Sequence, residues 1–144
     1  MFNPELSFGQ IINNNDLMRI FNCKNCGGMR RSKKTNSLIL IMDYTKKLYD
    51  DKRYQNRVFF TGMGTKGNMD LLFDQNKTLF ESSFNGVELF LFEVHNRGEY
   101  SYMGRVKLIS RPYQENQIDI EGNVRRVWIF PLELIDYMKG NANY

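Results

Sequence analysis

The sequence predicts one domain of the α+β class that is mainly β, folded as a curved barrel with two or three short helices. The 144 residues contain a single alanine but 11 Phe, 8 Tyr and 16 Asn. Aromatic side chains favour strands, and Asn favours turns. Short apolar segments also recur along the chain with turn residues between them. This spacing is typical of a barrel or strongly curved sheet and not of a doubly wound fold.

Two short helices are expected. Asn15 is the candidate N-cap of a helix that runs to Phe21, with Asp16 in its first turn, where a carboxylate is favourable. Residues 74–83 contain the second helix, which begins near the acidic residue at its start.

Strands are expected where apolar residues cluster or alternate. Residues 37–42 (SLILIM) form a continuous apolar run, typical of a central strand buried on both faces. Residues 87–94 (VELFLFEV) alternate, and Asn85-Gly86 supplies a turn before them. A hairpin turn is expected at Gly122-Asn123. With the following segments, the total is five to seven strands: 58–61, 100–109, 118–120 and 124–130.

The overall charge permits a polyanionic partner without requiring one. The net charge is +4 and the isoelectric point about 9.1. No apolar run approaches the roughly 20 residues of a membrane helix, and no secretory signal is visible. We therefore expect a cytoplasmic protein with no membrane contact, and a loose tail over residues 139–144.

No metal, cofactor or redox centre is expected. Cys23 and Cys26 form one Cys-x-x-Cys, and His95 is the only histidine, so at most three zinc ligands are present where four are needed. The βαβ context of a redox motif is absent. The two cysteines are interpreted as ordinary reduced thiols, with an intermolecular metal site as the alternative.

The sequence shows no catalytic apparatus. His95 has no candidate nucleophile beside it, and the scattered acidic residues do not form a metal-dependent nuclease set. Gly62-x-Gly64-x-x-Gly67 matches the dinucleotide-binding pattern in letters only, because no βαβ unit surrounds it. We expect a binding module and not an enzyme.

Several short motifs in a fixed order resemble one family. The motifs are Gly27 to Ser32 (GGMRRS), Tyr49-Asp50-Asp51, Val58 to Gly62 (VFFTG), Asp74 to Leu79 (DQNKTL) and Tyr102-Met103-Gly104. This order is similar to the SRA (SET- and RING-associated, or YDG) family, and most of all to the SRA-like module of bacterial modification-dependent HNH restriction proteins. The resemblance covers residues 8–134, so the whole chain, 1–144, is interpreted as a single SRA-like domain.

The resemblance implies a PUA-like curved β-barrel that flips a modified cytosine into an aromatic pocket. Tyr49 and Phe60 match the two rings that sandwich the base, and Asp51 matches the carboxylate that reads the cytosine edge. Thr61 is expected beside the 5-substituent, with Gly62 next to it. Tyr102-Met103-Gly104 stands where the family has Tyr-Asp-Gly, so the central acid is lost.

Contacts to the DNA backbone are expected from a basic run. Lysine and arginine supply salt-dependent affinity for phosphates without reading sequence. Met29, beside this run, is a candidate apolar wedge for the gap left by a flipped base. The candidate phosphate-contact residues are Arg30, Arg31, Lys33, Lys34 and, more weakly, Lys66.

The predicted function is binding of double-stranded DNA with 5-methyl- or 5-hydroxymethylcytosine as the recognition module of a modification-dependent restriction system. An HNH nuclease domain or subunit is the expected partner, because the chain itself shows no group able to cut DNA. Two alternatives stay open. One is a PUA-like module for RNA or modified nucleotides. The other is a protein-interaction module in which Tyr49, Phe60 and Tyr102 belong to the core.

Overall fold

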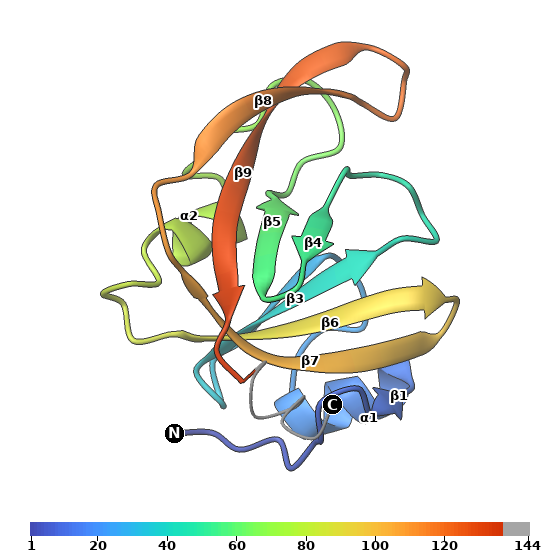
Figure 1. Cartoon of the computed structure of the whole chain (residues 1–144), viewed down its shortest axis with the longest axis vertical. Helices are drawn as coiled ribbons and strands as arrows, with labels where there is room; N and C mark the ends of the chain where they lie inside the picture. The colour runs from blue at the N-terminus through green and yellow to red at the C-terminus, as the bar shows by residue number, and fades with distance from the viewer. Residues whose placement is uncertain (137–144) are drawn as a thin grey trace.

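The computed structural model describes residues 1–136, and these residues form one strongly bent sheet with two helices (Figure 1). The main path of the sheet is β2-β3-β6-β7-β9-β5-β4, with β1 added to β7 and β8 added to β9. The elements are β1 (Ile11–Ile12), α1 (Asn14–Phe21), β2 (Met29–Ser32), β3 (Ser37–Asp43), β4 (Lys52–Tyr54), β5 (Arg57–Thr61), α2 (Gln75–Phe80), β6 (Glu88–Asn96), β7 (Glu99–Leu108), β8 (Tyr113–Ile118) and β9 (Val124–Leu134).

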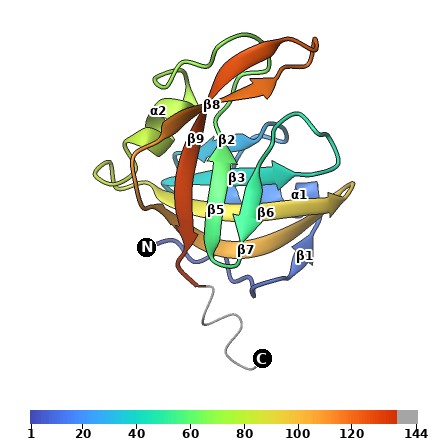
Figure 2. The same ribbon diagram turned by 45° about the horizontal axis from the view of Figure 1, so that its top comes forward.

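The bend folds the sheet over its own hydrophobic face. Figure 2 shows β5 and β9 crossing steeply over β3, β6 and β7, so that the two halves of the sheet face each other. The main core fills the space between them and includes Leu40, Phe60, Leu91 and Phe130. This arrangement confirms the predicted mainly β, curved-barrel class.

Strand β3 is buried on both of its faces, as its apolar run predicts. Leu38, Leu40 and Met42 point into the main core. Ile39 and Ile41 point the other way, into a second core that α1 covers. Successive side chains of a strand point to opposite faces, so a strand between two cores needs apolar residues at every position.

Helix α1 begins slightly earlier than expected. Its N-cap is Asn13, whose side chain accepts a hydrogen bond from the Asp16 N–H at 2.8 Å, and not Asn15. All three asparagines before Asp16 are suitable caps, so composition could not select one. Phe21, at the end of the helix, packs against the rings of Phe90 and Phe92 at 5.2 and 5.8 Å between centroids.

A bulge in β7 explains the glycine of Tyr102-Met103-Gly104. Leu91 pairs with Gly104 but Phe92 pairs with Tyr102, so Met103 is an extra residue at this point. Gly104 has φ +88°, a conformation that glycine adopts at low cost. The bulge bends β7 just before Val106, which pairs with β6 on one side and β9 on the other.

The structure extends some predicted elements and adds others. The segment 124–130 is the first part of the longer β9, and 118–120 is mostly turn, because β8 ends at Ile118. Helix α2 covers six residues of the expected 74–83. The strands β1, β2 and β4 were not predicted. Within the described residues, no helix is long and apolar enough to cross a membrane. The expected loose tail, 139–144, lies outside the described residues.

Candidate functional site

A cavity of about 530 Å³ opens between the loop that follows β3 and the strand β8. Such a volume is typical of a site for a small organic group. The walls are Tyr44, residues 47–51 and residues 116–118. Two of the residues predicted for the pocket, Tyr49 and Asp51, therefore lie in its wall.

Asp51 is fixed in the cavity wall by the end of β5. Its Oδ1 accepts a hydrogen bond from the Thr61 N–H at 2.7 Å. Burial raises the pKa of this carboxyl from 3.8 to about 7, although the bonds from the Thr61 backbone and hydroxyl act in the opposite direction. Near neutral pH, Asp51 is therefore able both to accept and to donate a hydrogen bond.

Tyr49 joins the cavity to a small cluster of buried side chains. It packs against Met69, in the loop after β5, and against Val127 and Ile129 of β9. Burial raises the pKa of the Tyr49 hydroxyl, so the ring is neutral in the working range of the protein. The ring is held by packing on one side while it lines the cavity on the other.

The structure corrects the position of Phe60. This side chain is only 2% exposed and belongs to the main core with Val58, and it is not in the wall of the cavity. Its neighbour Phe59 points the other way and packs in the cluster that holds Tyr49. Adjacent strand residues face opposite sides, and the core takes the second phenylalanine. The expected sandwich of Tyr49 and Phe60 is not formed.

Tyr44 is the second aromatic side chain of the cavity wall, and sequence reasoning missed it. It follows directly after β3, and its N–H donates to the Val94 carbonyl at 3.0 Å. Its ring stacks on the His95 imidazole, with centroids 4.8 Å apart and planes 15° from parallel. Burial raises the pKa of the Tyr44 hydroxyl, and the nearby Glu93 and Asp51 add to this effect. An aromatic residue at the exit of a buried strand was the available signal.

His95 and Glu93 form a small network behind Tyr44. Glu93 is buried, with one carboxylate oxygen 2.6 Å from Arg53 Nε and the other 3.2 Å from His95 Nε2. The imidazole itself is exposed. The network fixes the ring on which Tyr44 stacks, so His95 lies in β6 behind Tyr44 and does not itself line the cavity.

Gln117 connects β8 to the rest of the site. Its side-chain amide donates to the Thr61 Oγ1 at 3.2 Å and to Glu115 at 3.1 Å. Its carbonyl accepts from the Asp50 N–H at 3.3 Å. Thr61 thus bonds both Asp51 and Gln117, but it is buried and does not itself line the cavity. Nothing in the polar segment around Gln117 signalled this role.

Gly62 does not line the cavity but lies against Asn76 of α2 and Phe130 of β9. A Cβ at this position would lie 2.7 Å from the Asn76 Oδ1 and 3.1 Å from the Phe130 ring. Asn76 is fully buried and bonds the Met63 N–H, the Met63 carbonyl and the Asp70 carbonyl. The glycine therefore lets α2 approach β5 and hold the loop that carries Met69.

Two residues of the predicted DNA-contact set are structural, which corrects their assignment. Met29 is 6% exposed and lies in the main core, so it is not a wedge. Arg30 is 4% exposed, donates to the Gly27 carbonyl and Asn14 at 2.9 and 2.6 Å, and lies over the Tyr100 ring. The two residues are adjacent in β2 and face opposite sides, so Met29 packs in the main core and Arg30 is buried against Asn14 and Tyr100.

The other basic residues of the set remain at the surface in part. Arg31 is half-buried and donates to the carbonyls of Ser32 and Ser37. Lys33 and Lys34 are exposed in the turn before β3, whereas the cavity follows the other end of that strand. Seven strand residues span roughly 20 Å. Lys66 is exposed, with its Nζ 3.6 Å from Glu121.

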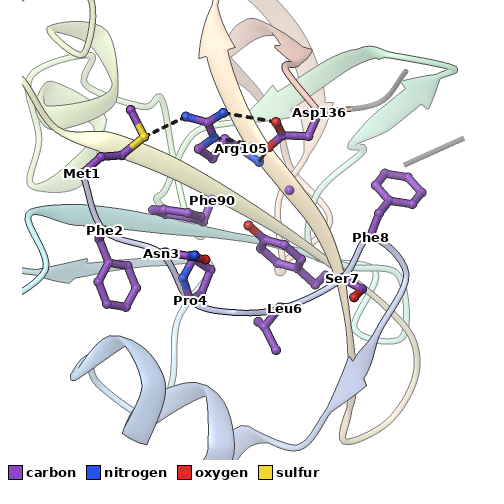
Figure 3. A pocket seen from close by; sticks show the side chains of 12 residues that line it. Met1, Phe2, Asn3, Pro4, Leu6, Ser7, Phe8, Phe90, Arg105 and Asp136 are labelled. Atoms are coloured by element: carbon purple, nitrogen blue, oxygen red, sulfur yellow. Dashed lines mark hydrogen bonds and ion pairs between the residues drawn. The ribbon is translucent and has the colours of Figure 1, made fainter. Parts of the chain in front are cut away.

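A larger cavity of about 630 Å³ lies under the N-terminal segment (Figure 3). Its wall includes Phe8, Phe90 and Tyr102 together with Arg105 and Asp136. The last two are already joined, because Arg105 donates to both carboxylate oxygens of Asp136 at 3.1 and 3.2 Å. None of the residues predicted for base or DNA contacts lies there, so the smaller cavity is the better candidate.

The two cysteines lie away from the cavity wall. Cys23 is half-buried against the second core, and burial raises the pKa of its thiol. Cys26 is exposed. In residues 1–136, no group of three or more His, Cys, Asp or Glu side chains is placed to hold a metal ion.

The fold is similar to that of solved SRA domains. The sulfur-binding and SRA domains of ScoMcrA, complexed with phosphorothioated DNA, match 90% of this chain with a TM-score of 0.73 at 17% identity. The modification-dependent TagI restriction endonuclease matches 92% with a TM-score of 0.67 at 17% identity. The SUVH5 SRA domain bound to fully hydroxymethylated CG DNA matches 92% with a TM-score of 0.67 at 16% identity. These likenesses confirm the predicted SRA-like fold.

The matches differ in how much of the other protein they cover. This chain spans 40% of the ScoMcrA chain with phosphorothioated DNA, 50% of TagI and 91% of the SUVH5 domain. No protein-family model matches the sequence, and no curated protein matches it at a significant level.

Proposed function

We propose that this chain binds double-stranded DNA that carries 5-methyl- or 5-hydroxymethylcytosine and holds the flipped base in the cavity between Tyr44 and β8. The observation that carries the proposal is Asp51, a carboxyl with a raised pKa, bonded to Thr61 in the wall of a cavity that two tyrosines also line. The SRA fold of the proteins described above, two of them bound to modified DNA, supports the same function.

The side chains of the cavity suit the chemistry of a cytosine. The exocyclic amino group of the base is a donor, and a carboxylate such as Asp51 is a suitable acceptor. Stacking on an aromatic ring is worth about 1–3 kcal/mol per base, and extrusion costs a few kcal/mol. Contacts with Tyr44 and Tyr49 would therefore offset much of the cost of flipping.

We also propose that the chain serves a modification-dependent restriction system. ScoMcrA and TagI are restriction endonucleases, and this chain matches only part of each. A nuclease domain or subunit of the HNH type would then perform the cutting in the cytoplasm. The chain itself would contribute recognition and no catalysis.

The proposal is tested by binding to matched duplexes that contain cytosine, 5-methylcytosine or 5-hydroxymethylcytosine at one position. We expect tighter binding to a modified duplex, and we expect Asp51→Ala and Tyr44→Leu to remove this preference. Asp16→Ala, which changes the same charge on α1, is the control and should keep it. Phe60→Leu should lower stability more than it lowers the preference.

Equal affinity for the three duplexes would overturn the proposal. A preference for single-stranded RNA over duplex DNA would point to the RNA-binding alternative. Absence of nucleic-acid binding even at low salt would point to the protein-interaction alternative. Retention of the preference in Asp51→Ala would remove this cavity from the function.

A further inference from the structure

The strands β8 and β9 form a two-stranded ribbon that extends beyond the rest of the sheet. Only Ile129 and later residues of β9 pair with β5 or β7. The first five residues, 124–128, have β8 as their strand partner, and on the other edge the Gly62 and Met69 N–H groups donate to the Trp128 and Arg126 carbonyls at 2.9 and 2.8 Å. Figure 1 shows this ribbon rising above the body of the molecule.

One face of the ribbon is exposed and apolar at its tip. Ile118 and Val124 are cross-strand partners, and their exposed fractions are 59% and 68%. Ile120, in the turn between the strands, is 51% exposed. Cross-strand partners share a face, so these side chains form one small apolar surface. Ile118 also lines the cavity that contains Asp51, and the surface is therefore continuous with the proposed base pocket.

The next cross-strand pair on the same face of the ribbon has one polar and one basic residue. Asn116 pairs with Arg126, and both residues are exposed. Asn116 also lies in the cavity wall. Thus the exposed face of the ribbon, opposite to the face of Gln117, carries an apolar tip and then a pair able to donate hydrogen bonds, and Asn116 and Ile118 reach the edge of the cavity.

The tip is held in a fixed shape, although its apolar residues are exposed. Asp119 accepts hydrogen bonds from the N–H groups of Glu121 and Asn123, both at 2.9 Å. Behind the tip, Arg125 is 4% exposed and donates to the Gly64 carbonyl at 2.6 Å. A ribbon that already has a fixed shape binds a partner with little further loss of conformational entropy.

We propose that this ribbon enters a groove of the duplex, where Ile118, Ile120 and Val124 fill the space that the extruded base leaves. Asn116 and Arg126 then face the base edges or phosphates beside that space. Two-stranded ribbons fit a DNA groove, and apolar side chains are known to wedge between base steps. The inference rests on the proposed function, because a gap exists only where a base is flipped.

The wedge is tested with the double variant Ile118→Ser/Val124→Ser, whose changes are at exposed positions. Ile11→Ser/Leu72→Ser is the control, since these residues are also exposed and apolar but lie in other elements. The first probe is a duplex with a paired 5-methylcytosine. The second is the same duplex with unmodified cytosine at that position, where no base is extruded and no gap forms.

We expect the ribbon variant to bind the modified duplex roughly tenfold or more weakly, since two buried aliphatic contacts are lost. Its loss on the unmodified duplex should be small, and the control should match the parent chain on both. A 2-aminopurine beside the modified base should brighten with the parent chain and not with the ribbon variant.

Failure of the wedge and failure of the proposed function give different results. If the parent chain prefers modified DNA and the ribbon variant binds both duplexes as tightly as the parent chain does, the wedge is overturned and the proposed function stands. Equal losses on the two duplexes also overturn the wedge. If the parent chain shows no preference for modified DNA, the proposed function fails, and the wedge fails with it.

Discussion

The carboxyl group of Asp51 is buried, which makes its ionisation unfavourable in the folded chain. Its pKa is raised from 3.8 to about 7 by burial, so the folded chain holds this proton more tightly than the unfolded chain does. Its contribution to stability is therefore complete below about pH 4 and declines as the pH rises through 7. Between pH 5 and 8, the loss is about 2–3 kcal/mol of unfolding free energy.

Replacement of Asp51 by Asn should remove this decline. Asn keeps an oxygen for the Thr61 N–H but carries no charge. Urea denaturation at pH 5, 6, 7 and 8 should show that the parent chain loses stability relative to Asp51→Asn as the pH rises. Asp16→Asn, at an exposed ion pair with Arg19, should follow the parent chain. Parallel curves for the parent chain and Asp51→Asn would contradict the raised pKa.

At the same scale, the sequence allowed only part of the site to be predicted. Tyr49 and Asp51 belong to one short motif that precedes the motif Val58 to Gly62. The two motifs are close in the chain, so a contact between Asp51 and Thr61 could be expected from the sequence. The choice between Phe59 and Phe60 depends on which face of β5 meets the core, and two adjacent phenylalanines do not reveal it. Tyr44 and Gln117 come from distant segments, and only the tertiary arrangement brings them together.

At the scale of elements, α2 and the loop after β5 act as one unit through Asn76. Asn76→Ala would leave the Met63 N–H and two carbonyls without this partner in a buried place. We expect a loss of about 2–4 kcal/mol of unfolding free energy. Amide hydrogen exchange at Met63 should accelerate as well, because its N–H loses its acceptor.

Lys77→Ala is the matched control for this change. Lys77 is the next residue of α2, is exposed, and forms an ion pair with Glu81 at the surface, a contact worth less than about 1 kcal/mol. If Asn76→Ala and Lys77→Ala have the same stability, Asn76 does not hold the loop. Slow exchange at Met63 in Asn76→Ala would lead to the same conclusion.

The strands that the sequence predicted share one property. β3, β5, β6, β7 and β9 carry apolar residues because they border a core, and this leaves a pattern in the chain. The strands β2 (MRRS), β4 (KRY) and most of β8 (YQENQI) are basic or polar. They exist because a neighbouring strand offers backbone partners, and that neighbour is not visible in their own residues.

At the scale of the whole molecule, two pairs of lysines lie at opposite ends of β3. Lys33 and Lys34 precede the strand, and Lys46 and Lys47 follow it in the loop that forms the cavity. All four side chains are exposed, but only Lys47 lines the cavity. If the flipped base enters this cavity, the phosphates of the duplex pass near the second pair and not near the first.

The double variant Lys46→Gln/Lys47→Gln should therefore weaken DNA binding in a salt-dependent way. The loss of two phosphate contacts should reduce the slope of log Kd against log salt concentration by about 2. The loss of affinity should be similar for modified and unmodified duplexes, because phosphate contacts carry no sequence information. Titrations at several salt concentrations between about 50 and 200 mM measure this slope.

Lys33→Gln/Lys34→Gln removes the same charge from the other end of β3 and serves as the control. Its slope should stay close to that of the parent chain, since a global loss of two charges acts only weakly beyond a Debye length of about 10 Å. A larger change of slope in Lys33→Gln/Lys34→Gln than in Lys46→Gln/Lys47→Gln would place the duplex at the turn before β3. The cavity at Asp51 would then lie too far from the DNA to receive a base.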